Sequence, residues 1–411
     1  MKKIITILIF LSVTFCADAQ FGNILDKAKK KAEDKVSRKV EDATDKKTEN
    51  KTEEEKAPEP TANSSEANKP TGIKVYSKFD FIPGEKIIVM EDFMQDAVGD
   101  FPDKWSTNSS AEIVTLEGKT GHWLMMPQPG VFMPEFIDTL PDNFTYEFDL
   151  FCIHGNKTGG WPSFHTAICQ LSNRDKPQDW QYSANYYYFS IYGGNSTDAT
   201  ISPTKRKNNT NESGIQIVTK QLADKNKSAH VSIWRQKERL RIYFNEEKIL
   251  DVPKALAMDV RYNSIVYFLP DIDEANRYCI SNLRLAVGAP DTRNKLLTEG
   301  KWITHGILFD VNSANIKAES YGTLKEIAGV LKENTGVKVR IVGHTDSDGD
   351  DKLNLDLSKK RANSVKEFLT REFSIDESRM ETDGLGESKP IDKNSSTAGK
   401  ANNRRVEFVK I

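Results

Sequence analysis

The sequence is poor in cysteine, in long apolar runs and in charge of one sign. Only 37% of its 411 residues are of the types AVILMFWYC and 29% are charged, so we expect part of the chain to lie outside any hydrophobic core. Lys+Arg number 58 and Asp+Glu 60, and this balance excludes a globally basic protein that wraps nucleic acid. After the N-terminus no run reaches about 18 apolar residues, so we expect no transmembrane helix in the mature chain.

The N-terminus has the pattern of a secretory signal peptide. Met1-Lys2-Lys3 precedes an almost wholly apolar run over residues 4–15, and Ala17-Asp18-Ala19 supplies a small-x-small cleavage site. We therefore expect residues 1–19 to be removed after Ala19 and the protein to be exported. The alternative is lipidation at Cys16, although Phe15 stands where bacterial lipoproteins usually have a small residue.

Cleavage at this point leaves three cysteines, Cys152, Cys169 and Cys279. The number is odd, so at least one thiol has no partner within the chain. A Cys152–Cys169 disulfide would fit an oxidising compartment if Gly159-Gly160 between them forms a hairpin turn. The alternative, which we favour, is that these cysteines are buried thiols.

Two segments precede the first core. Residues 20–56 are expected to form a charged helical segment with a narrow stripe of small or apolar residues. This pattern predicts a helical spacer or weak coiled coil, with weak self-association. The alternative is binding to a membrane surface, which would need bulkier apolar residues. The stripe is Leu25, Ala28, Ala32, Val36, Val40 and Ala43. Residues 57–72 contain Pro58, Pro60 and Pro70 among polar residues and predict a disordered linker.

Residues 73–290 carry short aromatic and β-branched runs that alternate with period two, which predicts an all-β sandwich. Within residues 234–244 we expect Trp234, Ile242 and Phe244 to face inward. The rhythm and order of these strands loosely resemble the concanavalin-like jelly rolls. The sequence does not decide whether the ligand of such a domain would be a glycan or a protein.

Two features of this region could carry carbohydrate chemistry. Glu147 and Asp149 share one strand face and could be the acid pair of a glycosidase, but we favour a solvated strand face and expect no enzyme. Aromatic residues could stack on sugar rings, but aromatic residues of a sandwich belong more often to its core. The aromatic candidates are Tyr186, Tyr188, Tyr192, Trp161 and Trp180.

Residues 291–411 alternate strand and helix patterns and predict a two-layer α/β sandwich. Strands are expected over residues 302–309, 337–342 and 405–411, and helices over 318–334 and 353–373. The complete chain is thus predicted to be multidomain: a charged helix and linker, a jelly-roll-like sandwich, and an α/β domain.

Five motifs occur in order in the last 115 residues or so, and together they resemble the OmpA C-terminal domain, the module shared with MotB and Pal proteins. The motifs are Phe309-Asp-Val-Asn-Ser-Ala-Asn, Val342-Gly-His-Thr-Asp346, Leu355-Asp-Leu-Ser-Lys-Lys-Arg361-Ala-Asn-Ser-Val365, Gly384-Leu-Gly-Glu-Ser-Lys-Pro390 and Asn402-Asn-Arg-Arg-Val-Glu-Phe408.

The resemblance implies non-covalent binding of the diaminopimelate residue of peptidoglycan, in the periplasm of a Gram-negative bacterium, with no cofactor. It implies that Asp346 pairs with the ligand's ammonium group and Arg361 with its carboxylate, while Asn312 and Arg404 line the same pocket. A departure from the family pattern is Leu353, where an aromatic residue often precedes the helix asparagine.

Physical chemistry supports this pair independently. A zwitterion needs one anion and one cation held close together, and an arginine fork fixes a carboxylate with two parallel hydrogen bonds. Asn354 and Arg361 are seven residues apart and so share one helical face, free to form a pocket wall. The alternative is an internal Asp346–Arg361 salt bridge that serves only the fold.

Metal binding is not expected in this region. The acidic run over residues 346–351 resembles a calcium loop, but Leu357 stands where an EF-hand needs a bidentate glutamate. No Cys or His stands at ligand spacing from His344.

Overall fold

The computed structural model describes residues 79–153, 163–193, 199–220, 228–272, 276–288 and 291–411. The predicted signal peptide, the alternative at Cys16, the charged helical segment and the linker lie outside these residues, as do Trp161 and the Gly159-Gly160 pair. No described helix is long and apolar enough to cross a membrane.

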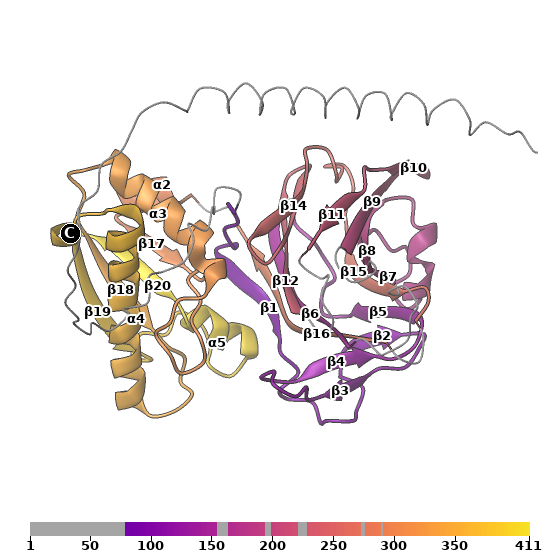
Figure 1. Ribbon diagram of the computed structural model, residues 1–411, viewed down its shortest axis with the longest axis horizontal. Coiled ribbons are helices and arrows are strands. Elements are labelled where there is room, and N and C mark those ends of the chain that lie inside the picture. The colour runs from indigo at the N-terminus through magenta and orange to yellow at the C-terminus, as the bar shows by residue number, and fades with distance from the viewer. Residues whose placement is uncertain (1–78, 154–162, 194–198, 221–227, 273–275, 289–290) are drawn as a thin grey trace, which may run out of the picture. The chain divides into compact units, whose positions relative to one another are not determined.

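Residues 79–288 form two packed β-sheets (Figure 1). The strands of the first sheet are β1 (Lys86–Glu91), β3 (Glu112–Val114), β4 (Trp123–Met126), β6 (Asn143–Ile153), β12 (Ser228–Gln236), β13 (Arg239–Phe244), β14 (Glu247–Val252) and β16 (Arg277–Val287). Their order is β14-β13-β12-β6-β16-β4-β3, and β1 also pairs with β16.

The second sheet has the order β10-β9-β8-β7-β15-β5-β2, and β11 also pairs with β9. Its strands are β2 (Trp105–Thr107), β5 (Gly130–Pro134), β7 (Ser163–Cys169), β8 (Tyr186–Gly193), β9 (Ala199–Lys207), β10 (Thr210–Ser213), β11 (Ile217–Thr219) and β15 (Ser264–Leu269). A 3-10 helix spans Pro177–Tyr182.

The core of the sandwich lies between the two sheets, as the period-two alternation predicts. Phe148 of β6 packs edge-on against Tyr267 of β15, with ring centroids 5.3 Å apart, and Phe164 of β7 lies beside both. The sandwich predicted for this region is confirmed, because residues from strands of both sheets are buried together in one apolar cluster.

The prediction that Trp234 faces inward is wrong. Ile233 reaches the inter-sheet core, and so do Ile242 and Phe244 as predicted, but Trp234 is one residue out of phase with them. Its ring packs edge-on against Phe81, at 6.1 Å between centroids, on the outer face of the sheet. The segment that contains Phe79 and Phe81 covers this outer face, and the face therefore carries buried aromatic residues such as Trp234 and Tyr243.

The three described cysteines are buried thiols and form no disulfide, as favoured. The alternative bridge rested on a hairpin between Cys152 and Cys169. Strand β6 pairs with β12 and β16, whereas β7 pairs with β8 and β15. The two cysteines therefore belong to different sheets, and strands β6 and β7 do not form the hairpin that the alternative bridge required.

The C-terminal part has a four-stranded sheet with helices packed against it (Figure 1). The sheet order is β17-β20-β18-β19, and β18 and β19 are parallel. The elements are α2 (Thr292–Leu297), β17 (Lys301–Thr304), α3 (Tyr321–Glu333), β18 (Val339–His344), α4 (Asp351–Phe373), β19 (Met380–Gly386), α5 (Thr397–Asn403) and β20 (Val406–Lys410), with 3-10 turns at Ala318–Ser320 and Glu377–Arg379.

Helix α4 follows from local sequence. Asp350 caps its N-terminus by accepting hydrogen bonds from the backbone N–H groups of Lys352 and Leu353, and Ser374 ends it in a left-handed conformation. Ala362, Val365 and Leu369 face the sheet at helical spacing. The predicted two-layer arrangement is therefore present, and it places the N-terminal half of α4 beside the carboxyl end of β18.

The described residues from 79 to 411 belong to one compact unit, in which the sandwich and the α/β domain touch. Phe79, Phe81 and Trp234 of the sandwich form an apolar cluster against which Tyr321 of α3 packs. A Cβ atom on Gly322 would lie 2.1 Å from the Phe81 carbonyl oxygen, so only glycine permits this approach.

Candidate functional site

The candidate site lies where β18 ends and α4 begins. Asp346 is buried just beyond β18, and its carboxylate accepts a hydrogen bond from the backbone N–H of Asp348 at 3.1 Å. The guanidinium of Arg404, just before β20, donates to the other oxygen of Asp346. The structure thus pairs Asp346 with Arg404 and not with Arg361.

Arg361 projects from α4 without an acidic partner. Its Nε donates to the Ser313 carbonyl at 2.9 Å, a second nitrogen lies 3.4 Å from the Asp310 carbonyl, and its guanidinium covers the Phe309 ring at 4.9 Å. Among the described residues, no carboxylate lies within ion-pair distance of it. Burial, and then the nearby Arg404, lower the pKa of Arg361.

The arrangement brings two guanidinium groups to one carboxylate. The alternative of an internal Asp346–Arg361 salt bridge is wrong, because Arg404 occupies that position. Arg361 keeps hydrogen-bonding capacity toward the cavity, and two guanidinium groups beside one carboxylate leave an excess positive charge that favours a bound anion.

Asn354 holds the loop that carries Asp346. Its side-chain Nδ2 donates to the Asp348 carbonyl at 3.1 Å and to Glu387 Oε2 at 2.7 Å, and it lies 3.4 Å from the Asp346 carbonyl. The residue is buried on α4, about two helical turns before Arg361. Asn354 therefore positions the loop as well as lining the pocket.

Asn312 is exposed in the turn between Phe309 and Ile316, which form an isolated β-bridge. Its φ of 53° is in the left-handed region that asparagine tolerates better than most residues. The same turn offers Arg361 its two carbonyl acceptors. All five predicted site residues line one cavity of about 520 Å³: Asn312, Asp346, Asn354, Arg361 and Arg404.

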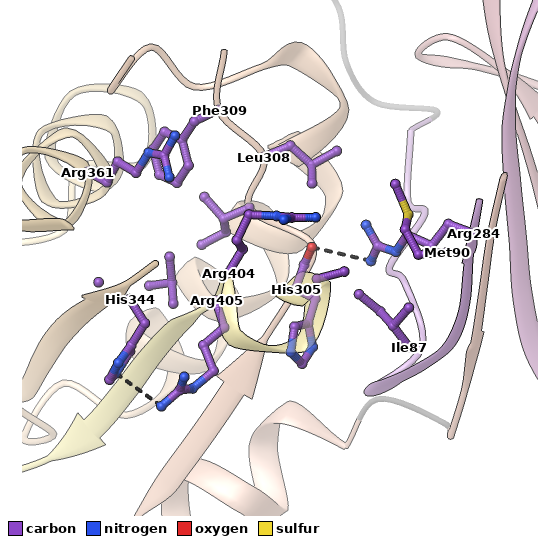
Figure 2. Close-up of a pocket in the computed structure, with 14 residues that line it drawn as sticks. Ile87, Met90, Arg284, His305, Leu308, Phe309, His344, Arg361, Arg404 and Arg405 are labelled. Carbon is purple, nitrogen blue, oxygen red and sulfur yellow. Dashed lines mark hydrogen bonds between the residues drawn. The ribbon is translucent and has the colours of Figure 1, made fainter. Parts of the chain in front are cut away.

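A second cavity, of about 160 Å³, borders the same arginines. Figure 2 shows Arg361 against Phe309 and, from the sandwich side, Met90 and Arg284 facing the C-terminal domain. Arg284 donates to the His305 carbonyl at 3.3 Å. The surroundings of the site therefore include side chains from both domains.

The acidic loop after β18 uses its carboxylates within the protein. Asp348 pairs with Lys400 at 2.7 Å, and Asp350 caps α4. Among the described residues, no group of three potential ligands could hold a metal ion. His344 is buried 3.5 Å from Glu407 and lines the smaller cavity.

The sandwich contributes residues to the 520 Å³ cavity that the sequence did not reveal as part of this site: Glu147, Asp149, His230, Asn282 and Arg284. His230 stands opposite Asp149 in the β12–β6 register, and donates to Asp149 at 2.7 Å and to Glu147 at 3.3 Å. The expected solvated strand face is therefore wrong for Glu147, which is 2% exposed. Only knowledge of which strands pair could have joined His230 to these acids.

The charges of this cluster argue against Glu147 and Asp149 as a glycosidase pair. Burial raises the pKa of Glu147, but Arg284 and His230 outweigh it and hold that pKa below its usual value. Burial likewise raises the pKa of Asp149, and His230 and Asn282 reverse the shift. Neither carboxyl group keeps the proton that a general acid must donate.

The aromatic residues considered for sugar stacking do not form one exposed surface. Trp180 and Tyr186 are buried and pack edge-on at 5.5 Å between ring centroids. The Tyr188 ring packs against Trp180, with centroids 5.4 Å apart. Of these four described residues, only Tyr192 is exposed, at 41%. The set is mainly a small core on the outer face of the second sheet.

In a comparison with known proteins, residues 308–404 match the OmpA family. The probable lipoprotein YiaD of Escherichia coli is 45% identical over 105 residues, 26% of this chain and 48% of that protein. The putative lipoprotein YfiB of the same organism is 36% identical over 113 residues, 27% of this chain and 71% of that protein. The chain thus spans less than half the length of YiaD.

Two solved structures are also similar. The peptidoglycan-associated lipoprotein from Burkholderia pseudomallei is 28% identical and covers 29% of this chain and 98% of its own, with a TM-score of 0.25. The carbohydrate binding module CBM66 from Bacillus subtilis is 16% identical and covers 45% of this chain and 96% of its own, with a TM-score of 0.30.

Proposed function

The chain belongs to the OmpA family through its C-terminal domain, and on this premise we propose that it binds peptidoglycan without a covalent bond and anchors an exported β-sandwich domain to the cell wall. The ligand group is the zwitterionic centre of diaminopimelate in the stem peptide. The function is binding and not catalysis.

The observation that carries this proposal is the state of Arg361. It is a partly buried guanidinium stacked on Phe309, oriented by two backbone carbonyls, and without an acidic partner among the described residues. Such a group is preorganised for a carboxylate, because its orientation is fixed before the ligand arrives.

The ammonium group of the ligand binds at Asp346. One oxygen of this carboxylate is bound by Arg404 and the other by a backbone N–H, so its position is fixed and its charge is retained. A carboxylate oxygen can accept more than one hydrogen bond, which leaves room for an ammonium donor. Arg404 shares the ligand's carboxylate with Arg361, and Asn312 closes the edge of the pocket.

Co-sedimentation of the full mature chain with purified peptidoglycan tests this function. Asp346→Ala and Arg361→Ala should each abolish sedimentation, and free diaminopimelate should compete with the wild type. Arg371→Ala is a matched control, because Arg371 lies on the same helix but is exposed, and its contacts are with Glu372 and the Phe368 ring and not with the cavity. Undiminished sedimentation of both site variants would overturn the proposal.

A further inference from the structure

The cavity at the OmpA-type site has a second wall that belongs to the sandwich. Asp149 and His230 line it together with Asp346 and Arg361. Carboxylates outnumber cationic side chains around this cavity, and the cationic side chains come from both domains. The cavity therefore presents both signs of charge, as a zwitterionic ligand requires.

Asp149 is held in place with its charge intact. Its Oδ1 accepts from His230 at 2.7 Å and its Oδ2 accepts from Asn282 at 2.7 Å, while 29% of the side chain remains exposed. Asn282 has a φ of 54° and lies where the β16–β6 register shifts between Ser281 and Arg284. A bulge of this kind redirects a side chain, and here it directs an amide to Asp149.

Three buried polar atoms around the cavity make no hydrogen bond within the described residues: Glu147 Oε1, Arg284 Nε and Thr345 Oγ1. The first two face each other at 3.6 Å as an ion pair, so their charges are matched within the sandwich. Thr345 is 5% exposed, and since buried hydroxyl groups are usually hydrogen-bonded, its Oγ1 is a group that a polar ligand could satisfy.

We propose that the two domains bind one ligand together, with Asp149 of the sandwich as a second acceptor for the ammonium group whose carboxylate lies at Arg361. This inference rests on the proposed function and adds a residue from outside the OmpA domain to its site. An ammonium group has three N–H donors, and Asp346 is already engaged by Arg404 and a backbone N–H.

The ligand class that follows is a free zwitterionic amino-acid centre. A peptide whose side-chain amine is acylated in a cross-link lacks the ammonium that Asp149 and Asp346 would share. Asp149 therefore strengthens the preference for the unlinked stem peptide that Asp346 alone would already give.

Calorimetric titration of the full mature chain with diaminopimelate and with pimelate, which lacks both amines, tests the role of Asp149. Asp149→Asn keeps the shape of the side chain and should weaken diaminopimelate binding at least about fivefold, with pimelate binding unchanged or stronger. Asp149→Glu keeps the charge and should retain most of the preference for diaminopimelate. Asp251→Asn is the matched control, since Asp251 lies in the same sheet with its side chain also 29% exposed.

Each outcome separates this inference from the proposed function. The proposal that both domains bind one ligand is overturned by either of two results for an Asp149→Asn protein that melts like the wild type. One is wild-type affinity for both diaminopimelate and pimelate, and the other is an equal loss of affinity for both. If Arg361→Ala binds diaminopimelate normally, the proposed function itself fails. Loss of binding in Arg361→Ala with a selective loss in Asp149→Asn supports both.

Discussion

Asn402 and Ile87 exchange two hydrogen bonds across 315 residues of sequence: the Ile87 N–H donates to Asn402 Oδ1 at 3.0 Å, and Asn402 Nδ2 donates to the Ile87 carbonyl at 2.9 Å. The amide side chain thus serves the edge strand β1 as a neighbouring strand would. Asn402 thereby joins the α/β domain to the sandwich, and it satisfies both the N–H and the C=O of the buried Ile87.

We expect Asn402→Ala to lower the free energy of unfolding by about 2–4 kcal/mol, because it leaves the buried N–H and C=O of Ile87 without partners. Denaturant unfolding measures the loss, and faster hydrogen exchange at the Ile87 amide locates it. Asn315→Ala, at an exposed asparagine, should change the stability by less than about 0.5 kcal/mol. Equal effects of the two substitutions would contradict this account of the interface.

Two glycines of α3 provide a matched test of how closely the domains approach. Gly322→Ala should cost about 2–3 kcal/mol, because the added Cβ would lie 2.1 Å from the Phe81 carbonyl oxygen. Gly329→Ala should instead stabilise the protein by roughly 0.5–1 kcal/mol, because nothing lies within 4 Å of its Cβ position and alanine favours a helix. Thermal unfolding of both variants compares them, and the same sign for both would refute the close contact.

Substitution of Arg361 by lysine tests geometry apart from charge. Lysine keeps the positive charge but loses both the planar fork and the stacking on Phe309, so we expect diaminopimelate affinity to fall about 10- to 100-fold. Calorimetry measures the affinity, with Arg371→Lys as control. An unchanged affinity would show that the site needs only a point charge.

His230 should make the stability depend on pH. Burial lowers the pKa of this imidazole, but its hydrogen bonds to Asp149 and Glu147 outweigh burial and raise the pKa from 6.5 to about 10. The folded state therefore holds the proton more tightly than the unfolded state. The resulting stabilisation is fully present below pH 6.5 and is lost as the pH rises toward 10.

Unfolding free energies of wild type and His230→Gln, measured from pH 6 to 10, check this dependence. The advantage of the wild type should shrink steadily across that range. A constant difference between wild type and His230→Gln would mean that the imidazole does not carry the charge.

The sequence predicted the elements well and their packing partners less well. The alternating pattern predicted the strands of the sandwich, yet Trp234 faces outward, where the segment around Phe81 covers that side of the sheet. Alternation identifies two faces of a strand but not what covers each of them. The same limit explains Cys152 and Cys169, which lie in different sheets although they are close in sequence.

The site shows the same division. Ordered motifs brought Asp346, Arg361 and Arg404 to one cavity, because a strand end and a helix face fix them locally. Which arginine pairs with Asp346 depended on β20 lying beside β18, a non-local pairing. His230 and Asn282 could not be connected to the site from sequence, since their position follows from how two domains pack.

Strand β1 determines how a mechanical load would pass through the protein. It is part of the sandwich through its pairing with β16, and Asn402 ties it to the C-terminal domain. If the C-terminal domain is held at the wall as proposed, a pull on the sandwich reaches that domain partly through β1, and the two hydrogen bonds between Asn402 and Ile87 bear part of the force.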